Sequence, residues 1–186
     1  MFTKDFHEVE VWVPHRISGF FQMMDPSLPR PEDPTQIGSR GAGPSLMAFG
    51  KTKIIKNSDS NKIKIGNNGS FSVFINELDC SEEAKTSLTV IQQMENLLPQ
   101  NSNFIISHKF DLPLGCGYGS SAAGALGIVY GLNALYQLGL SAKNAAKYAH
   151  IAEVLNHTGL GTVGGQMEGG LRSEEHTSEL QSPNTI

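Results

Sequence analysis

The segment from Pro113 to Ala123 constrains the fold of this chain more than any other. It reads Pro-Leu-Gly-Cys-Gly-Tyr-Gly-Ser-Ser-Ala-Ala, so glycines at alternate positions lead directly into two serines and an apolar run. Glycine permits positive φ angles and a close approach of the backbone to a ligand. The first N–H groups of a following helix, with the positive end of its dipole, favour a phosphate group. The pattern therefore predicts a phosphate-binding loop at the start of a helix.

Two familiar phosphate-binding patterns do not fit this segment. A P-loop requires a lysine after its last glycine, whereas Ser120 follows Gly119 here. A dinucleotide fingerprint requires a wider spacing between its second and third glycines than Gly117 and Gly119 provide. Ser120 and Ser121 lie where a hydroxyl can either cap the helix or reach a metal bound to phosphate. A plain glycine-rich turn before a core helix stays open as the alternative.

The composition argues against several classes of protein. The 186 residues suffice for one domain and at most a fragment of a second. A net charge of −4 without a Lys/Arg run argues against a nucleic-acid partner. The sequence shows neither a signal peptide nor an apolar run of membrane-spanning length, and its six histidines lack metal-site spacing. Cys80 and Cys116 fit a reducing compartment, so we expect a cytoplasmic protein with no membrane partner.

Alternating apolar residues predict the strands, and prolines and glycines predict the breaks between them. A first strand is expected over Glu8–Val13, ended by Pro14 and followed by an irregular loop rich in proline over residues 25–34. The run Gly38-Ser-Arg-Gly-Ala-Gly43 is interpreted as a second tight glycine segment. Further strand signals follow over 51–65, over 71–75 after an Asn-Asn-Gly turn, and over 103–112.

Three helices are expected among these strands. Ser81 is predicted to cap one that runs to about Leu98, and Ser141 one that runs to about Asn156. Between them, residues 120–138 are apolar almost all round, which predicts a buried central helix. A glycine-rich turn is expected over residues 158–170. Strands followed by helices indicate an α+β domain of two layers.

The glycine segment resembles the phosphate loop of the GHMP kinases, the family of galactokinase, homoserine kinase and mevalonate kinase. The residues that match are Pro113, Gly117, Gly119, Ser120, Ser121, Ala122 and Ala123, while Tyr118 replaces a leucine. The resemblance implies the N-terminal lobe of such a kinase, with a fold similar to the second domain of ribosomal protein S5. It also implies ATP and Mg²⁺ as cofactors.

Four further segments resemble archaeal pantoate kinases within this family. They are Val13–Phe21 with Asp25-Pro26, Gly38–Gly43, Ala149–Val154 and Thr158–Val163, so that the resemblance covers about Val9 to Leu171. It implies the ATP-dependent phosphorylation of pantoate to 4-phosphopantoate in coenzyme A synthesis, and a homodimer of the full-length enzyme is a further expectation. A homoserine-type or mevalonate-type kinase stays open, and so does a nucleotide-binding relative that has lost catalysis.

The resemblance also implies roles for individual residues. The phosphates would be bound by Gly115, Gly117, Gly119, Ser120, Ser121 and Ala122. The Mg²⁺ ion would be held by Ser121 and Glu153, which with Arg16 form the catalytic set. The acceptor would be bound by His15, Ser18, Arg40 and Thr162. Plainer roles remain open for two of these positions, a solvated carboxylate for Glu153 and a surface turn residue for Arg40, and the nearby Thr158 can simply cap a turn.

Two positions depart from the family pattern. Arg16 stands where relatives have His or Lys, which keeps a cation that cannot act as a base. Thr162 stands where many of these kinases carry a base-type aspartate, so we expect no carboxylate base there. Phosphoryl transfer tolerates this loss, since its catalysis consists mostly of positioning and charge stabilisation.

The last fifteen residues differ in character from the rest. From Arg172 to Ile186 the chain is polar and resembles the translation of a DNA-sequencing adapter, so we expect a non-native tail after a domain of residues 1–171. A GHMP kinase would continue here into a C-terminal lobe. The expectation is therefore that this 186-residue chain exposes apolar surface and has little activity by itself.

Overall fold

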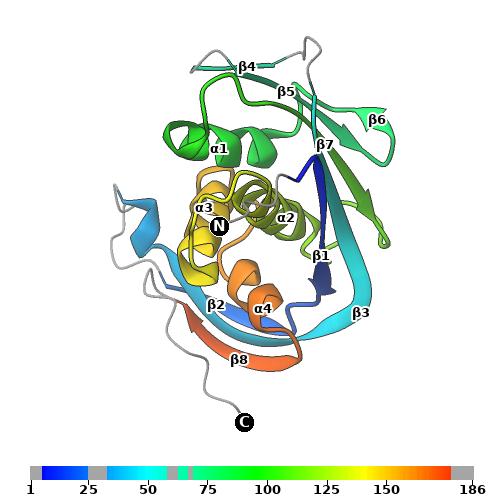
Figure 1. Cartoon of the computed structure of the whole chain (residues 1–186). Coiled ribbons are helices and arrows are strands. Elements are labelled where there is room, and N and C mark those ends of the chain that lie inside the picture. Colours follow the sequence, from blue (N-terminus) through cyan, green and yellow to red (C-terminus); the bar gives the residue numbers. More distant parts are fainter. Residues whose placement is uncertain (1–5, 25–32, 58–62, 67–68, 177–186) are drawn as a thin grey trace.

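A computed structural model of the chain describes residues 6–24, 33–57, 63–66 and 69–176 (Figure 1). These residues form one sheet of eight strands and four α-helices. The strands are β1 (Glu8–Arg16), β2 (Phe20–Met24), β3 (Gly38–Lys56), β4 (Ile63–Ile65), β5 (Gly69–Ile75), β6 (Leu78–Asp79), β7 (Asn103–Phe110) and β8 (Leu171–His176). The α-helices are α1 (Lys85–Met94), α2 (Ser120–Leu135), α3 (Ala142–Leu155) and α4 (Thr162–Glu168), with short 3₁₀ turns at Pro34–Gln36 and Glu95–Leu97.

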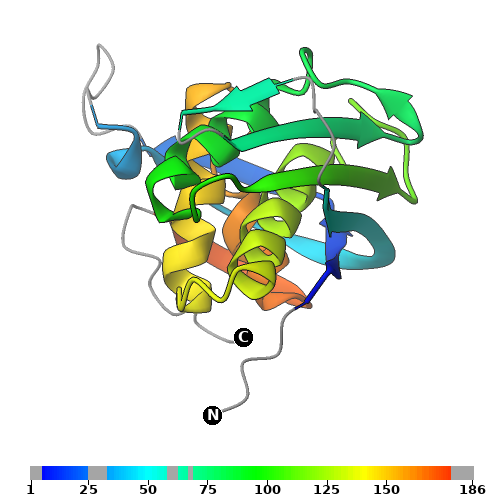
Figure 2. The ribbon, with the colours of Figure 1, turned by 45° about the horizontal axis from the view of Figure 1, so that its top comes forward.

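The helices pack on one side of the sheet, which curves around them (Figures 1 and 2). The main path of the sheet runs β1-β3-β7-β5-β4. β5 and β7 pair in parallel, and the other strand pairs are antiparallel. This arrangement confirms the predicted α+β fold of two layers. None of the helices in the described ranges has the length and apolar character needed to cross a bilayer.

The long strand β3 organises the molecule and corrects the prediction for its first residues. Its second half pairs with β1 and β7, and its first half pairs with β2 and β8. The glycines over residues 38–43 therefore lie in a strand, and the predicted tight segment is wrong. A Cβ atom at Gly41 would overlap the carbonyl of Phe20, and one at Gly43 would overlap that of Ile17. Glycine is needed there because the neighbouring backbone approaches closely.

Strand β1 also runs further than predicted. Pro14 does not end it, because the strand continues to Arg16 through a shift of register between Pro14 and Arg16. A proline has no N–H to donate, and such an irregularity is a place where a sheet accommodates it. The three added residues carry His15 and Arg16 to the end of the sheet where the glycine loop lies.

The sequence predicted three helices. Helices α1, α2 and α3 lie at the predicted positions, although some of their ends differ from the prediction. Ser141 caps α3 as predicted, since its Oγ accepts a hydrogen bond of 3.2 Å from the N–H of Asn144. Ser81 does not cap α1, because its hydroxyl bonds instead to the N–H of Val73 and to Asp79, and the helix begins at Lys85. The expected turn after residue 158 contains a fourth helix, α4, that the sequence did not predict.

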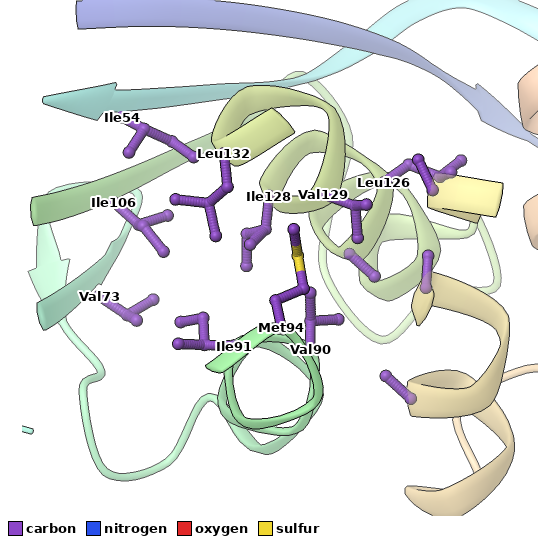
Figure 3. Packing of buried hydrophobic residues seen from close by; sticks show 14 of the residues in the cluster. Ile54, Val73, Val90, Ile91, Met94, Ile106, Leu126, Ile128, Val129 and Leu132 are labelled. Carbon is purple, nitrogen blue, oxygen red and sulfur yellow. The ribbon is translucent and has the colours of Figure 1, made fainter. Parts of the chain in front are cut away.

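The hydrophobic core lies between the sheet and helices α1 and α2 (Figure 3). Ile54, Val73 and Ile106 point into it from the sheet, and Ile91 and Met94 from α1 (Figure 3). Helix α2 is buried over most of its length, as its apolar sequence predicted. Packed between sheet and neighbouring helices, α2 holds its first residues, and with them the glycine loop, in a fixed place.

The predicted domain boundary at residue 171 coincides with the first residue of β8. The backbone of Leu171–His176 forms β8 and pairs with β3, so the described structure continues beyond that boundary. Pairing of backbone does not reveal the origin of a sequence, so the non-native tail stays a prediction, and residues 177–186 lie outside the described residues. The prediction of a turn at residues 67 and 68 and most of the predicted proline-rich loop also fall outside them.

Large apolar side chains are exposed on β2 and β3, among them Phe20, Phe21 and Met47.

Candidate active site

The glycine loop has the backbone conformation that its sequence predicted. Gly115, Gly117 and Gly119 have φ angles of +73°, +80° and +68°, a region that residues with a side chain rarely adopt. At Gly115 and Gly117 an added Cβ atom would meet nothing within 4 Å, so the space beside the loop is open. At Gly119 the same atom would lie 2.6 Å from the methyl group of Thr162 and 2.8 Å from Nε2 of Gln166. The loop is therefore open on one side and tightly packed where it enters α2.

Helix α2 begins without a side-chain cap. Gly119 is the N-cap residue, and its carbonyl accepts the first helical hydrogen bond, 3.0 Å from the N–H of Ala123. Neither Ser120 nor Ser121 caps the helix, which removes one of the two predicted roles for their hydroxyls. The N–H groups of Ser120, Ser121 and Ala122 precede the first helical bond and have no acceptor within the helix. They are donors at the positive end of the helix dipole.

Residues from two other elements hold the loop in place. The carbonyl of Tyr118 accepts hydrogen bonds from the backbone N–H of Arg16, at 3.1 Å, and from Nδ1 of His15, at 3.0 Å. The carbonyl of Gly119, which also accepts the first helical bond, accepts a hydrogen bond of 2.9 Å from Nε2 of Gln166 on α4. Sequence reasoning assigned no role to Gln166, because a single glutamine among glycines carries no pattern.

Glu153 lies beneath the start of α2, on the buried side of α3. Its side chain is 1% exposed, so the predicted alternative of a solvated carboxylate is wrong. Burial raises its pKa above the usual value, and hydrogen bonds from Thr158 and Ser121 act in the opposite direction. Oε2 is buried and has no hydrogen-bond partner among the described residues. The structure therefore brings the predicted pair Ser121 and Glu153 together, with one carboxylate oxygen left over.

This pair is a suitable donor set for Mg²⁺ bound together with a nucleotide. Magnesium in such sites takes one or two protein carboxylates and fills its other positions with water and phosphate oxygens. A buried carboxylate oxygen without a partner fits that requirement. No cluster of three or more His, Cys, Asp or Glu side chains gathers within the described ranges, so an all-protein metal cage is not built from them.

The residues predicted to bind the acceptor lie in two different places. His15 and Arg16 are buried at the end of β1 against the loop, and Thr162 begins α4 with its methyl group beside Gly119. Ser18 and Arg40 are exposed. In the register of the sheet Arg40 pairs with Gln22, whereas Arg16 pairs with Ser45. Arg40 is thus five residues along β3 from the level of Arg16, about 16 Å at the usual rise of a strand.

Known proteins resemble this chain in sequence. Residues 85–167, which run from α1 into α4, match the family described as GHMP kinases N terminal domain. A pantoate kinase of Methanospirillum hungatei is 35% identical over 163 residues, covering 87% of this chain and 51% of the relative. A pantoate kinase of Thermococcus kodakarensis is 32% identical and is covered to 50%. The chain thus spans about half the length of the curated relatives it matches.

Solved structures resemble it in fold. A protein described as a phosphotransferase related to the coenzyme A biosynthesis pathway superimposes with a TM-score of 0.78 at 28% identity, over 96% of this chain and 57% of that one. The mevalonate kinase of Methanococcus jannaschii superimposes with a TM-score of 0.66 at 14% identity, over 96% of this chain and 56% of that one, which shows a shared fold alone. Residues 85–167 thus match the GHMP kinase N-terminal domain in sequence, and the chain shares its fold with these two solved proteins.

Proposed function

We propose that this domain binds ATP with Mg²⁺ and serves a kinase that phosphorylates pantoate to 4-phosphopantoate in coenzyme A synthesis. The observation that carries the proposal is the loop of three glycines with positive φ angles, which opens α2 directly beside the buried carboxylate of Glu153. Support for pantoate as the acceptor comes from the two relatives that are pantoate kinases, each more than 30% identical to this chain.

In the proposed mechanism the loop holds the nucleotide by its phosphates. The N–H groups from Gly117 to Ala122 donate to the β- and γ-phosphates, aided by the dipole of α2. Ser121 Oγ and Oε2 of Glu153 are the atoms that would hold a Mg²⁺ ion. When bound, Mg²⁺ neutralises charge on the phosphate oxygens during transfer. The buried carboxylate of Glu153 would lose its proton more readily beside that cation, which offsets the effect of its burial.

The acceptor is bound by cations and positioned without a carboxylate base. Arg16 is buried at the end of β1, and its backbone N–H bonds to the loop, which supports a role beside the phosphates. A guanidinium there stabilises the charge that spreads over the phosphoryl oxygens during transfer. We propose that Arg40, exposed on β3, reaches the carboxylate of pantoate with its forked donors. Thr162 borders the loop. Because threonine has no carboxylate to act as a base, catalysis relies on positioning and charge stabilisation.

The compartment proposed for the enzyme is the cytoplasm. Cys80 and Cys116 are both free thiols. Free thiols, one of them exposed, suit a reducing environment better than an oxidising one.

A panel of acceptors tests the choice of substrate. The full-length protein is incubated with ATP, Mg²⁺ and pantoate, homoserine or mevalonate in turn, and ADP release is measured. The proposal predicts release well above background with pantoate alone. Release with homoserine or mevalonate instead would contradict pantoate as the acceptor while keeping the kinase, and ATP binding without release for any acceptor would favour a relative that has lost catalysis.

A further inference from the structure

Two consecutive carbonyl groups of the glycine loop are each held by two donors. The carbonyl of Tyr118 accepts the N–H of Arg16 and Nδ1 of His15, and the carbonyl of Gly119 accepts the N–H of Ala123 and Nε2 of Gln166, all at 2.9–3.1 Å. A carbonyl oxygen has two lone pairs, so both acceptors are fully used. The two peptide planes of the loop nearest to α2 are therefore fixed, one from β1 and one from α4.

Fixing these carbonyls also fixes two donors. In a trans peptide unit the C=O and the next N–H point in opposite directions within one plane. Holding the carbonyl of Tyr118 against β1 thus turns the N–H of Gly119 away from β1. Holding the carbonyl of Gly119 against α4 turns the N–H of Ser120 away from α4. Both N–H groups belong to the segment that the proposed function assigns to the phosphates.

The two side chains that provide these bonds are suited to the task. His15 is 0% exposed and Gln166 is 2% exposed, so neither bond competes with water. Since a carbonyl only accepts, His15 must carry its proton on Nδ1 and Gln166 must present its NH₂ group. The remaining atoms, Nε2 of His15 and Oε1 of Gln166, are buried and have no hydrogen-bond partner among the described residues. The contacts with the loop thus account for the orientation of both side chains.

We propose that His15 and Gln166 are positioning residues that aim the N–H groups of Gly119 and Ser120 at the phosphates of the nucleotide. The inference rests on the proposed function of the loop, and it adds Gln166, a residue without a motif that would have predicted a role. It also changes the role of His15. Because Nδ1 of His15 bonds to the loop, substituting His15 should change the affinity for ATP rather than the affinity for the acceptor.

Gln166→Met tests the contact from α4, because methionine keeps the length of the side chain and removes the donor. Val163→Ala is the matched control, since Val163 is buried on the same helix and does not bond to the loop. Binding of ATP to the full-length protein is measured directly, with thermal unfolding in parallel. We expect Gln166→Met to weaken ATP binding about fivefold to tenfold, the scale of one lost buried hydrogen bond. Val163→Ala should lower the unfolding temperature and leave ATP affinity within about twofold. Unchanged ATP affinity in Gln166→Met, or an equal loss in Val163→Ala, would overturn the proposal.

A pair of substitutions at His15 tests the contact from β1 independently of α4. His15→Leu removes the donor, whereas the side-chain amide of His15→Asn can place an N–H close to the position of Nδ1. We expect His15→Leu to weaken ATP binding about fivefold to tenfold and His15→Asn to recover most of that loss. No recovery in His15→Asn, or a rise in the pantoate KM without a change in ATP affinity, would contradict a positioning role.

These measurements separate the inference from the proposed function. Direct binding of ATP needs no acceptor, so a protein that binds ATP and does not phosphorylate pantoate would refute the proposed reaction and leave the inference to be judged by the variants. A wild-type protein without measurable affinity for ATP would overturn both.

Discussion

Thr158 Oγ1 donates a hydrogen bond of 2.6 Å to Oε1 of Glu153, and this bond joins the end of α3 to the turn before α4. The backbone N–H of Thr158 also donates to the carbonyl of Glu153, at 3.0 Å. The turn therefore holds one carboxylate oxygen and leaves the other, Oε2, buried and without a hydrogen-bond partner among the described residues. Burying a charged carboxylate away from water is costly unless a cation or a hydrogen-bond donor contacts it. We propose that this oxygen binds Mg²⁺.

Glu153→Gln should lower turnover by about 10²-fold, the scale of one lost transition-state contact. The amide keeps an acceptor for Thr158 and removes the charge that holds the cation. Ser121→Ala should act in the same direction while leaving ATP binding largely intact. Glu168→Gln, at an exposed position on α4, is the control and should retain full turnover. Steady-state rates over a range of Mg²⁺ concentrations provide the check, and an unchanged rate in Glu153→Gln would remove the residue from the metal site.

Gly119→Val should abolish ATP binding. The φ angle of +68° strains any β-branched residue, and the added atoms would press on Thr162 and Gln166. Gly139→Val is a matched control, because Gly139 also has a positive φ, +73°, and an added Cβ atom there meets nothing within 4 Å. The control carries the backbone strain without the contacts at the loop. ATP affinity by titration calorimetry distinguishes them, and equal affinity in the two variants would exclude the loop as the phosphate site.

Arg40→Lys should raise the KM for pantoate by several-fold and leave the KM for ATP nearly unchanged. Lysine keeps the charge and cannot form the forked pair with a carboxylate. Steady-state kinetics with each substrate varied in turn is the measurement. Equal increases in both KM values would assign Arg40 a structural role in the curved part of β3, where it pairs with Gln22.

His108 makes the stability of the fold depend on pH. Burial lowers the pKa of His108 from 6.5 to about 4, with its ring between Thr52 and Ser87. The unfolded chain takes up this proton near pH 6.5 and the folded chain only near pH 4, so the stabilisation is complete above about pH 6.5 and is lost as the pH falls toward 4. The loss amounts to about 3 kcal/mol at 1.36 kcal/mol for each pKa unit.

Urea unfolding at several pH values checks this prediction. His108→Gln, which stays neutral and can still bond to the hydroxyls, should flatten the dependence between pH 4 and pH 6.5. A pH dependence in His108→Gln as steep as in the wild type would show that other groups cause it.

The parts of the fold that the sequence predicted are those where a local pattern has a single physical meaning. Alternate glycines before a run of small apolar residues led to the loop and to α2, and Ser141 marked the start of α3 because a serine before a helix satisfies a free N–H. The same rule failed at Ser81, whose hydroxyl is taken by the backbone of β5, a contact that depends on tertiary structure.

The glycines of residues 38–43 and of α4 were wrongly predicted to form turns, for a related reason. A glycine permits a turn, and it also permits the close packing of two backbones, and the sequence alone does not tell which is used. In β3 the neighbouring backbone at Phe20 and Ile17 requires glycine, whereas in α4 Gly164 and Gly165 lie buried within a helix. The pairing of Ser121 with Glu153 came from family resemblance, since no spacing relates two helices that meet only in the folded chain.

The most direct test of the central claim is to identify the product by mass. The full-length protein is incubated with ATP, Mg²⁺ and pantoate, and the acceptor is recovered and analysed by mass spectrometry and by NMR of phosphorus. We predict a phosphorylated pantoate that carries its phosphate on the terminal hydroxyl, is formed with one ADP for each product molecule, and is absent in Gly119→Val. Pantoate recovered unchanged from a protein that phosphorylates another alcohol, or from one that binds ATP and transfers nothing, would contradict it.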